Sequence, residues 1–294
     1  MYSSADKVEP KHSINIRPHL AILRRALRAA TRRVLHPSDA RIIDSFPMFS
    51  PASAGSARDL AAVTVKAAEQ TFPLLLNISS LNGEARSTIV PITCFADDMS
   101  KRLAAAKLKE LYNYYGSDKA RYHDYHLLYG SLLSKPTSVT AVLEIGLGTN
   151  NPRLISNMGK SGRPGGSLRA FRDFLPKAQV YGADIDRQIL FEEDRITTFF
   201  VDQTDPASLA ALAGLIGDHF DLIIDDGLHS PNANLAVLDF GLRKLKVGGW
   251  LVVEDIRSEA LPIWQLTAAI MPQQFEARLI TDRKTALFAV QRLA

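Results

Sequence analysis

The second half of the chain alternates between short apolar segments typical of strands and longer segments with helical periodicity. The apolar segments VTAVLEIG (139–146) and FDLIIDDG (220–227) are followed by the helical patterns SLRAFRDFL (167–175) and PNANLAVLDFGLRKL (231–245). Such alternation is typical of a parallel sheet that is covered by helices on both faces. The sequence therefore predicts a doubly wound, mostly parallel α/β sheet, with two further strands that close it near the C-terminus.

The first hundred residues lack this regularity. Residues 44–60 are rich in Ser, Pro, Ala and Gly, which predicts a linker or an irregular surface segment. Residues 61–95 contain short apolar runs whose helical or strand character the sequence leaves open. A helix is predicted over 101–115, and the glycine that follows it marks its end. We therefore expect an N-terminal basic helix and accessory region at 1–100 and a main domain at 101–294.

The N-terminal segment is strongly basic. Residues 1–43 contain nine Lys or Arg and three Asp or Glu, although the whole chain has a formal net charge of only +4. Residues 17–35 (RPHLAILRRALRAATRRVL) place leucines at near-helical spacing with arginines between them. A helix of this kind packs on its own protein or on a second subunit, or it makes a peripheral contact with an anionic membrane. We expect a homo-oligomer, and no nucleic-acid partner because aromatic interleaving and nucleic-acid modules are missing.

Cysteine content and hydropathy bear on the cellular compartment. The chain has one cysteine, Cys94, so no internal disulfide is expected. No apolar run approaches the roughly 20 residues that span a bilayer, and no signal-peptide pattern opens the chain. These features predict a cytoplasmic protein.

A glycine turn follows the first predicted strand of the regular half. In the segment LEIGLGTNN, Gly146 and Gly148 allow the chain to turn tightly and to approach a ligand closely. Glu144 lies in this otherwise apolar strand, where its burial would be costly without a bonding partner. Ligands of open parallel sheets bind beyond the carboxyl ends of the strands, so these three residues are candidates for a cofactor site. The third glycine of a dinucleotide fingerprint is missing.

Polar residues also follow the next two predicted strands. Asp184 ends the strand in GADID and is placed to accept hydrogen bonds from the two hydroxyls of a ribose. Asp202 and Gln203 follow in VDQTD, where they can reach the edge of an adenine. Together with the glycine turn, these strand ends predict a bound adenosine.

The segment LIIDDGLHS ends a buried strand in two adjacent carboxylates and a histidine. The next predicted strand ends in VEDI, so Asp226, Glu254 and Asp255 are predicted to converge. Three oxygen ligands without a cysteine suit Mg²⁺, or Mn²⁺. His229 lies at the same rim, where a neutral imidazole could accept a proton, although alone it would be an ordinary loop histidine. Asp225 is expected to support the turn or to orient a ligand-binding residue without touching the ligand itself, and we place it with the cofactor-site candidates.

Five of these segments resemble one known superfamily when they are taken together. LEIGLG, GADID, VDQTD, IIDDGLH and GGWLVVEDI resemble class I S-adenosylmethionine-dependent methyltransferases, and within them the metal-dependent sugar O-methyltransferases of macrolide and related natural-product pathways. The resemblance runs from about residue 108 to the C-terminus. It implies a Rossmann-like methyltransferase fold with a seven-stranded sheet, S-adenosyl-L-methionine and Mg²⁺ or Mn²⁺ as cofactors, and a sugar-containing acceptor whose hydroxyl is methylated.

The resemblance also assigns roles to single residues. It includes the upstream signature YGSDKARYHDYHLLY (115–129), which in the family folds over the methionine end of the cofactor. The matching cofactor candidates here are Ser117, His123 and Tyr125. The implied metal ligands and general base are residues already singled out at the rim: Asp226, Glu254 and Asp255 for the metal, and His229 for the base.

The chain departs from the family pattern after the glycine turn, where residues 149–165 intervene before the next helix. A loop of this length in a compact domain is usually a lid or a binding element. Two other interpretations remain. A nucleotide-dependent oxidoreductase on a similar sheet is disfavoured by the missing glycine and by the acid cluster. A non-catalytic cofactor-binding protein that attaches to a membrane surface through residues 17–35 is disfavoured by the complete acid cluster with His229.

Overall fold

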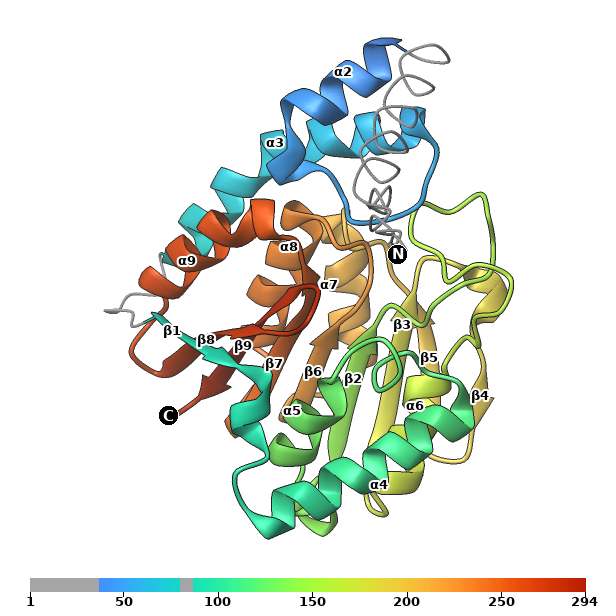
Figure 1. The fold of residues 1–294 in the computed structure, drawn as a ribbon, viewed down its shortest axis with the longest axis vertical. Coiled ribbons are helices and arrows are strands. Elements are labelled where there is room, and N and C mark those ends of the chain that lie inside the picture. Colours follow the sequence, from blue (N-terminus) through green and yellow to red (C-terminus); the bar gives the residue numbers. More distant parts are fainter. Residues whose placement is uncertain (1–36, 80–86) are drawn as a thin grey trace, which may run out of the picture.

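A nine-stranded sheet forms the centre of the structure (Figure 1). The structure is a computed structural model that describes residues 37–79 and 87–294, so the predicted basic helix at 17–35 lies outside the described residues. The strand order is β1-β8-β9-β7-β6-β2-β3-β5-β4. The strands are β1 (Ser87–Pro91), β2 (Ala141–Ile145), β3 (Gln179–Asp184), β4 (Glu192–Glu193), β5 (Ile196–Phe200), β6 (Phe220–Asp225), β7 (Leu245–Ile256), β8 (Phe275–Thr281) and β9 (Ala286–Arg292).

The prediction of an α/β sheet is confirmed, whereas the prediction of a seven-stranded sheet is wrong. The parallel pairs are β2–β3, β2–β6, β3–β5, β6–β7 and β1–β8. The pairs β4–β5, β7–β9 and β8–β9 are antiparallel, so the sheet is mixed. The strands β1 and β4 occupy the two edges. They were beyond sequence reasoning because β4 has two residues and β1 comes from the segment whose character the sequence left open.

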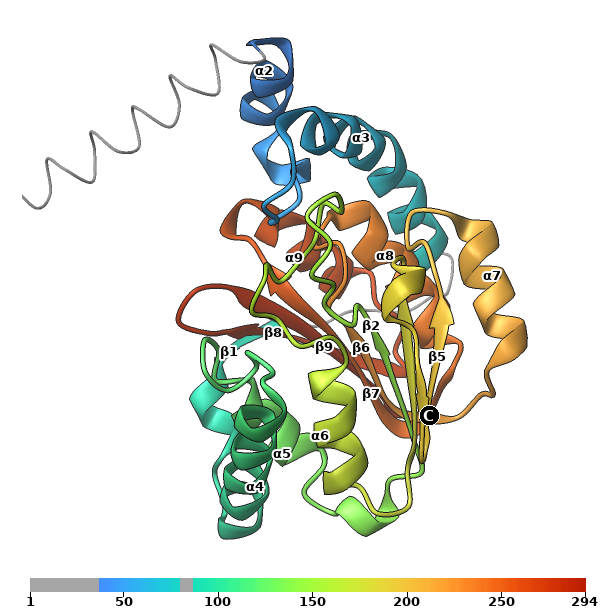
Figure 2. The same cartoon turned by 90° about the vertical axis from the view of Figure 1, so that its right-hand side faces the viewer.

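Helices cover both faces of the sheet (Figure 2). On one face, called the α4–α6 face, Leu108, Tyr129 and Phe171 of the helices pack with Val142 and Leu222 of the strands. On the other, called the α8 face, residues of α3, α7, α8 and α9 pack with the alternate strand residues. The helices are α2 (Pro37–Ser45), α3 (Ala57–Ser79), α4 (Met99–Tyr115), α5 (Tyr125–Leu132), α6 (Gly166–Phe174), α7 (Pro206–Leu215), α8 (Pro231–Leu242) and α9 (Leu261–Ala269).

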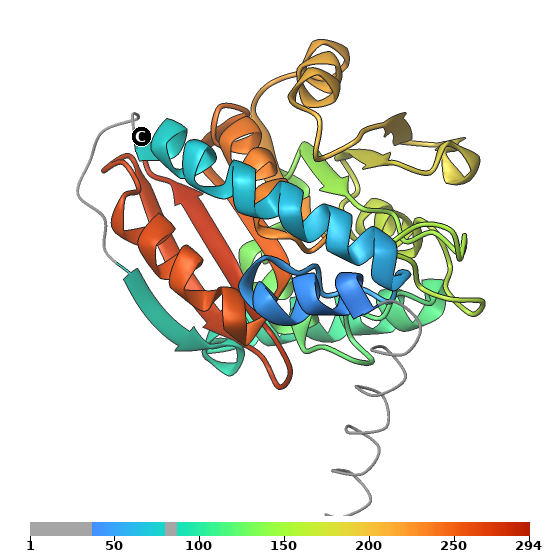
Figure 3. The ribbon, with the colours of Figure 1, turned by 90° about the horizontal axis from the view of Figure 1, so that it is seen from above.

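The described N-terminal residues, 37–79 and 87–100, are built onto the same sheet. The helix α3 packs on α8 and on α2, and Figure 3 shows it lying across the molecule beside α9 and α8. The predicted helix over 101–115 corresponds to α4, which ends at Gly116 in a left-handed conformation with φ 76°. The domain boundary at residue 100 stays a prediction, because β1 of the N-terminal part pairs with β8 of the C-terminal part.

None of the helices in the parts 37–79 and 87–294 is both long and apolar enough to cross a membrane.

Candidate active site

A cavity of about 1770 Å³ lies beyond the carboxyl ends of the parallel strands. Its floor contains the glycine turn after β2, the end of β3 and the turns after β5, β6 and β7. The usual small-molecule site measures about 300–1,000 Å³, so this cavity has room for two ligands. The sequence-predicted residues that line it are Ser117, Gly146, Gly148, Asp184, Asp202, Gln203, Asp226, His229 and Asp255.

The turn after β2 has glycine at positions where a side chain would not fit. Gly146 has φ 99°, and a Cβ atom there would lie 2.1 Å from the backbone oxygen of Asp226. Gly148 has φ 76°, and a Cβ atom there would lie 2.2 Å from Met158 Cε. Positive φ and close approach both require glycine. The turn therefore packs closely against the backbone of Asp226 and the side chain of Met158.

Polar groups at the ends of β3 and β5 are fixed beside this turn. Asp184 accepts hydrogen bonds from the backbone N–H groups of Leu147 at 2.7 Å and Asp186 at 2.8 Å. Gln203 accepts from the Leu228 N–H at 2.8 Å. Burial raises the pKa of the Asp184 carboxyl, although these backbone donors oppose the rise. A carboxylate has more lone pairs than these two donors use, so Asp184 can still accept from ribose hydroxyls.

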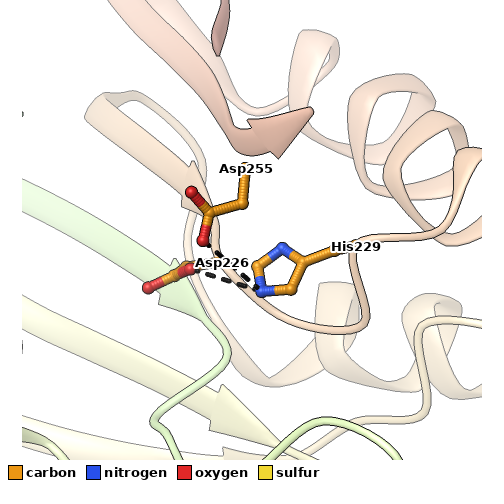
Figure 4. Close-up of side chains that lie close together, drawn as sticks. All are labelled: Asp226, His229 and Asp255. Atoms are coloured by element: carbon orange, nitrogen blue, oxygen red, sulfur yellow. Dashed lines mark ion pairs between the residues drawn. The ribbon is translucent and has the colours of Figure 1, made fainter. Parts of the chain in front are cut away.

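At the other end of the cavity, two carboxylates and an imidazole face one another (Figure 4). His229 Nε2 lies 3.7 Å from Asp226 Oδ1 and 3.9 Å from Asp255 Oδ2. One ligand atom from each of the three residues lies within 4.8 Å of the others, which is a spacing that can hold a metal ion. His229 and Asp255 have φ values of 54° and 55°, which non-glycine residues adopt rarely and often at functional sites. The His229 Nδ1 is buried without a hydrogen-bond partner among the described residues.

Directly beneath this rim, one buried lysine pairs with three carboxylates. Lys119 Nζ lies 2.7 Å from Asp226 Oδ2, 2.6 Å from Glu254 Oε2 and 3.1 Å from Glu144 Oε1. The second oxygen of Glu254 accepts a hydrogen bond from the Tyr129 hydroxyl. Both Glu254 oxygens are therefore engaged below the cavity, while Asp226 uses one oxygen below and presents the other to His229.

The charges of this cluster shift the pKa values of its members in different directions. Burial raises the pKa of Glu254 well above the ordinary value, and the nearby Asp226 adds to the rise. Burial lowers the pKa of Lys119, but the three carboxylates outweigh it and hold that pKa well above its ordinary value. Burial also raises the pKa of Asp255, but His229, His123, the Tyr125 hydrogen bond and Lys119 together outweigh it, so the net pKa is lowered. Asp255 is therefore the carboxylate most readily ionised at this rim.

The alternation of side chains along a strand explains why Glu144 and Glu254 lie on the same face of the sheet. Successive side chains of a strand point to opposite faces. In β2, Val142 packs on the α4–α6 face, so Glu144 points the same way and accepts from Ser167 of α6 at 2.5 Å. In β7, Val252 and Glu254 share that face. The assignment of Glu254 as a metal ligand stays a prediction, since the structure places it against Lys119 rather than beside His229.

Asp225 points to the opposite face from its neighbour Ile224. It accepts hydrogen bonds from Asn234 of α8 at 2.8 Å and from Gln203 at 2.5 Å. The same Gln203 holds the N–H of Leu228, so Asp225 braces the turn that carries Asp226 and the histidine.

Two of the residues assigned by resemblance to the methionine end of the cofactor lie beside Asp255. The Tyr125 hydroxyl donates to Asp255 Oδ1 at 2.5 Å. His123 stacks on the Tyr125 ring, and its Nδ1 lies 3.0 Å from Asp282 Oδ2. Neither lines the cavity, whereas Ser117 does. Their contact with a cofactor stays a prediction.

Residues 43–54 and 154–158, called the roof, also line the cavity. The second segment belongs to the loop 149–165, which was predicted as a lid or a binding element, whereas the first was not among the predicted site residues. The composition of the first segment had indicated only a linker or irregular surface. In the structure its Ala52 N–H donates to the backbone oxygen of His229 at 3.3 Å. Ile155 of the second segment packs on Leu60 and Ile43. Lys119 was also missed: it lies in the upstream signature, but no sequence signal pairs it with distant carboxylates.

The ends of β3 and β5 carry polar groups suited to a nucleoside, and an acid–histidine cluster lies beside them. On a sheet of this kind, the combination is typical of the class I S-adenosylmethionine-dependent methyltransferases, which the chain resembles. No protein-family model matches the chain. Comparison with curated proteins narrows the resemblance. The chain is similar to sugar O-methyltransferases of polyketide and macrolide pathways, at 31–40% identity over the matched segments.

Two relatives illustrate the extent of the similarity. The 8-demethyl-8-alpha-L-rhamnosyl tetracenomycin-C 2'-O-methyltransferase of Streptomyces olivaceus is 35% identical over 153 residues, which cover 51% of this chain and 38% of the relative. The mycinamicin VI 2''-O-methyltransferase of Micromonospora griseorubida is 40% identical over 93 residues, which cover 31% of this chain and 23% of the relative. The match thus spans well under half the length of these relatives.

Among solved structures, the chain is similar to the MycE methyltransferase of the mycinamycin biosynthetic pathway in complex with Mg and S-adenosylhomocysteine. That comparison has a TM-score of 0.42 and 31% sequence identity, and it covers 51% of this chain and 37% of MycE.

Proposed function

We propose that this chain transfers a methyl group from S-adenosylmethionine to a hydroxyl of a sugar-containing acceptor. The observation that carries the proposal is that one cavity contains both a region suited to a nucleoside and an acid–histidine cluster. Glycine-turn and strand-end groups suited to a nucleoside line one end, and the cluster of Asp226, His229 and Asp255 lines the other. The named relatives methylate sugar hydroxyls, which supports the choice of acceptor.

The residues present fit the proposed cofactor. Asp184 has acceptor capacity for the ribose hydroxyls, and Asp202 and Gln203 lie where an adenine edge would pass. Gly146 and Gly148 line the cavity beyond β2, where their backbone can approach a ligand closely. We infer that S-adenosylmethionine lies along these strand ends, with its sulfonium directed at the rim.

The rim also fits a divalent cation, Mg²⁺ or Mn²⁺. Asp226 and Asp255 would hold it through their cavity-facing oxygens, which suits the preference of these ions for carboxylates. A cation bound there would lower the pKa of an acceptor hydroxyl. Glu254 remains the predicted third ligand, and cation binding to Glu254→Gln tests whether it takes part.

The chain's own residues then supply proton removal and alignment. His229 Nε2 faces the space between the two carboxylates, so it is placed to accept the proton of the acceptor hydroxyl. The imidazolium that forms is stabilised by Asp226 and Asp255. The acceptor oxygen attacks the methyl carbon in line, and the methyl–sulfur bond breaks to leave S-adenosylhomocysteine. Holding both partners in one cavity makes this alignment possible.

Methyl transfer from labelled S-adenosylmethionine to a panel of sugar-bearing acceptors tests the proposal. The panel includes the rhamnosyl tetracenomycin that names one relative. Activity is expected with Mg²⁺ or Mn²⁺ and lost in EDTA. His229→Ala should lower turnover by about 10²–10⁴-fold, the usual share of a general base, while affinity for S-adenosylhomocysteine persists.

His219→Ala is the matched control, because His219 is exposed and does not line the cavity. Full activity of metal-free protein would contradict the role of the cation. Binding of NADH in place of S-adenosylhomocysteine would favour the oxidoreductase interpretation instead.

A further inference from the structure

Among the described residues, four lysine and arginine side chains line the cavity, and three of them already have partners. Lys119 is held by three carboxylates. Arg257 forms an ion pair of 3.5 Å with a nearby glutamate. The Arg121 guanidinium lies over the Tyr122 ring, 5.4 Å from its centroid. The Arg163 guanidinium makes no ion pair or aromatic contact with any residue that the structure describes.

Arg163 is held beside the glycine turn by its own loop. The Gly165 N–H donates to the Leu147 oxygen at 2.8 Å, and the Gly166 N–H donates to the Arg163 oxygen at 3.1 Å. The aliphatic stem of Arg163 lies against Gly116, where a Cβ atom would be 2.6 Å from the arginine Cδ. The guanidinium therefore lies near the point where the turn after β2 contacts the turn after α4.

The cavity leaves one place for the third part of the proposed cofactor. Its adenosine belongs at Asp184 and Gln203, beyond β3 and β5, and its methyl group must reach the His229 rim beyond β6 and β7. Because β2 lies between these strands, the amino-acid part is left the space above β2. Ser117 lines this space too. A carboxylate there would be costly to desolvate unless a charged donor met it.

We propose that Arg163 binds the carboxylate of the methionine part of S-adenosylmethionine. The assignment rests on the proposed function. The planar guanidinium matches a carboxylate through two parallel hydrogen bonds, which a lysine at the same place would not provide. The same contact draws residues 149–165 onto the cofactor and gives this loop a binding role.

Calorimetric titration with two compounds that differ only in the carboxylate tests the assignment. They are S-adenosylhomocysteine and its decarboxylated analogue, S-adenosyl-3-thiopropylamine. Arg163→Met is expected to weaken binding of the first by about 10–100-fold and to leave binding of the second unchanged, since a charged hydrogen-bonded pair is lost only with the first. Arg153→Met should change neither affinity, because Arg153 lies in the same loop and is exposed like Arg163 but does not line the cavity.

Two results would overturn the assignment while the proposed function stands. The first is unchanged affinity of Arg163→Met for S-adenosylhomocysteine. The second is an equal loss for both compounds, because the guanidinium would then support the loop and not the carboxylate. Arg163→Lys keeps the charge and should recover part of the lost affinity if the assignment holds. Failure of the unmutated protein to bind either compound would overturn the proposed function, and the assignment with it.

Discussion

At the scale of single residues, the lysine beneath the rim determines how the acids are divided. Lys119 binds Glu144 and Glu254 and one oxygen of Asp226, so only the second oxygen of Asp226 remains for the cavity. A buried carboxylate without a positive partner is strongly unfavourable. The lysine therefore allows three acids to be buried close to a fourth, Asp255, without mutual repulsion dominating.

Replacing this lysine should destabilise the fold. Lys119→Met leaves the buried carboxylates of Glu144 and Glu254 without a positive partner, so the free energy of unfolding at pH 8 should fall by about 3–5 kcal/mol. Urea denaturation measures it, and Lys109→Met, on the exposed side of α4, is the control and should change little. Equal urea midpoints for both variants would show that the carboxyls are protonated in the folded protein.

At the scale of secondary-structure elements, the short edge strand β4 depends on a charge cluster with α6. Glu193 of β4 accepts from Arg169 Nη2 at 2.7 Å and from Arg172 Nη1 at 2.9 Å. The hydrogen bond from Arg169 contributes most, and with Arg172 it lowers the pKa of Glu193 below its ordinary value. A strand of two residues has little ladder of its own, so the contact with α6 fixes where this edge lies.

The lowered pKa of Glu193 has a defined consequence for stability against pH. A depressed folded-state pKa stabilises the fold above the unfolded-state pKa, about 4.3, and this contribution is lost as pH falls through the folded-state value. Glu193→Gln should therefore be less stable than the unmutated protein by about 0.5–1 kcal/mol at pH 7, and this deficit should be smaller near pH 3. Urea denaturation at both pH values measures the difference.

The neighbouring Glu192→Gln is the control for that experiment, since Glu192 is exposed and forms no ion pair with the described residues. A Glu193→Gln deficit that is the same at both pH values would mean that packing, and not charge, is responsible.

At the scale of the whole molecule, the roof joins parts of the chain that are far apart in sequence. Ile155 from the loop after β2 packs with Ile43 of α2 and Leu60 of α3. Figures 1 and 2 show α2 and α3 at the end of the molecule opposite α4. Segments from the N-terminal part and from the long loop therefore line the same cavity.

Loosening the contact at Ile155 should open the roof without unfolding the sheet. Ile155→Ala removes apolar contacts at a half-buried site, so a cost of about 1–2 kcal/mol is expected locally. Hydrogen exchange should become faster at residues 42–61 and unchanged in β2 and β6. Leu154→Ala, a cavity-lining neighbour outside the Ile155 cluster, is the control. Equally faster exchange in the strands would show that the roof is part of the global folding unit.

The sequence by itself determined the parts of this protein whose signals are local. Hydrophobic periodicity and turn residues placed α4, α6, α8 and the central strands, and the rule that ligands bind at the carboxyl ends of parallel strands predicted which residues would share a cavity. Asp184 ends β3, and Asp226 and His229 follow β6, so that rule placed all three at the edge of the sheet where they line the cavity.

Only the tertiary structure decided the features that depend on contacts between distant segments. The pairing of Lys119 with acids from β2 and β7, the two added edge strands and the roof all join residues whose separation along the chain carries no local signal. Which oxygen of an acid faces the cavity depends on strand alternation combined with these partners. The residue types at the rim could therefore be predicted from the sequence, whereas the orientation of their side chains depends on the fold.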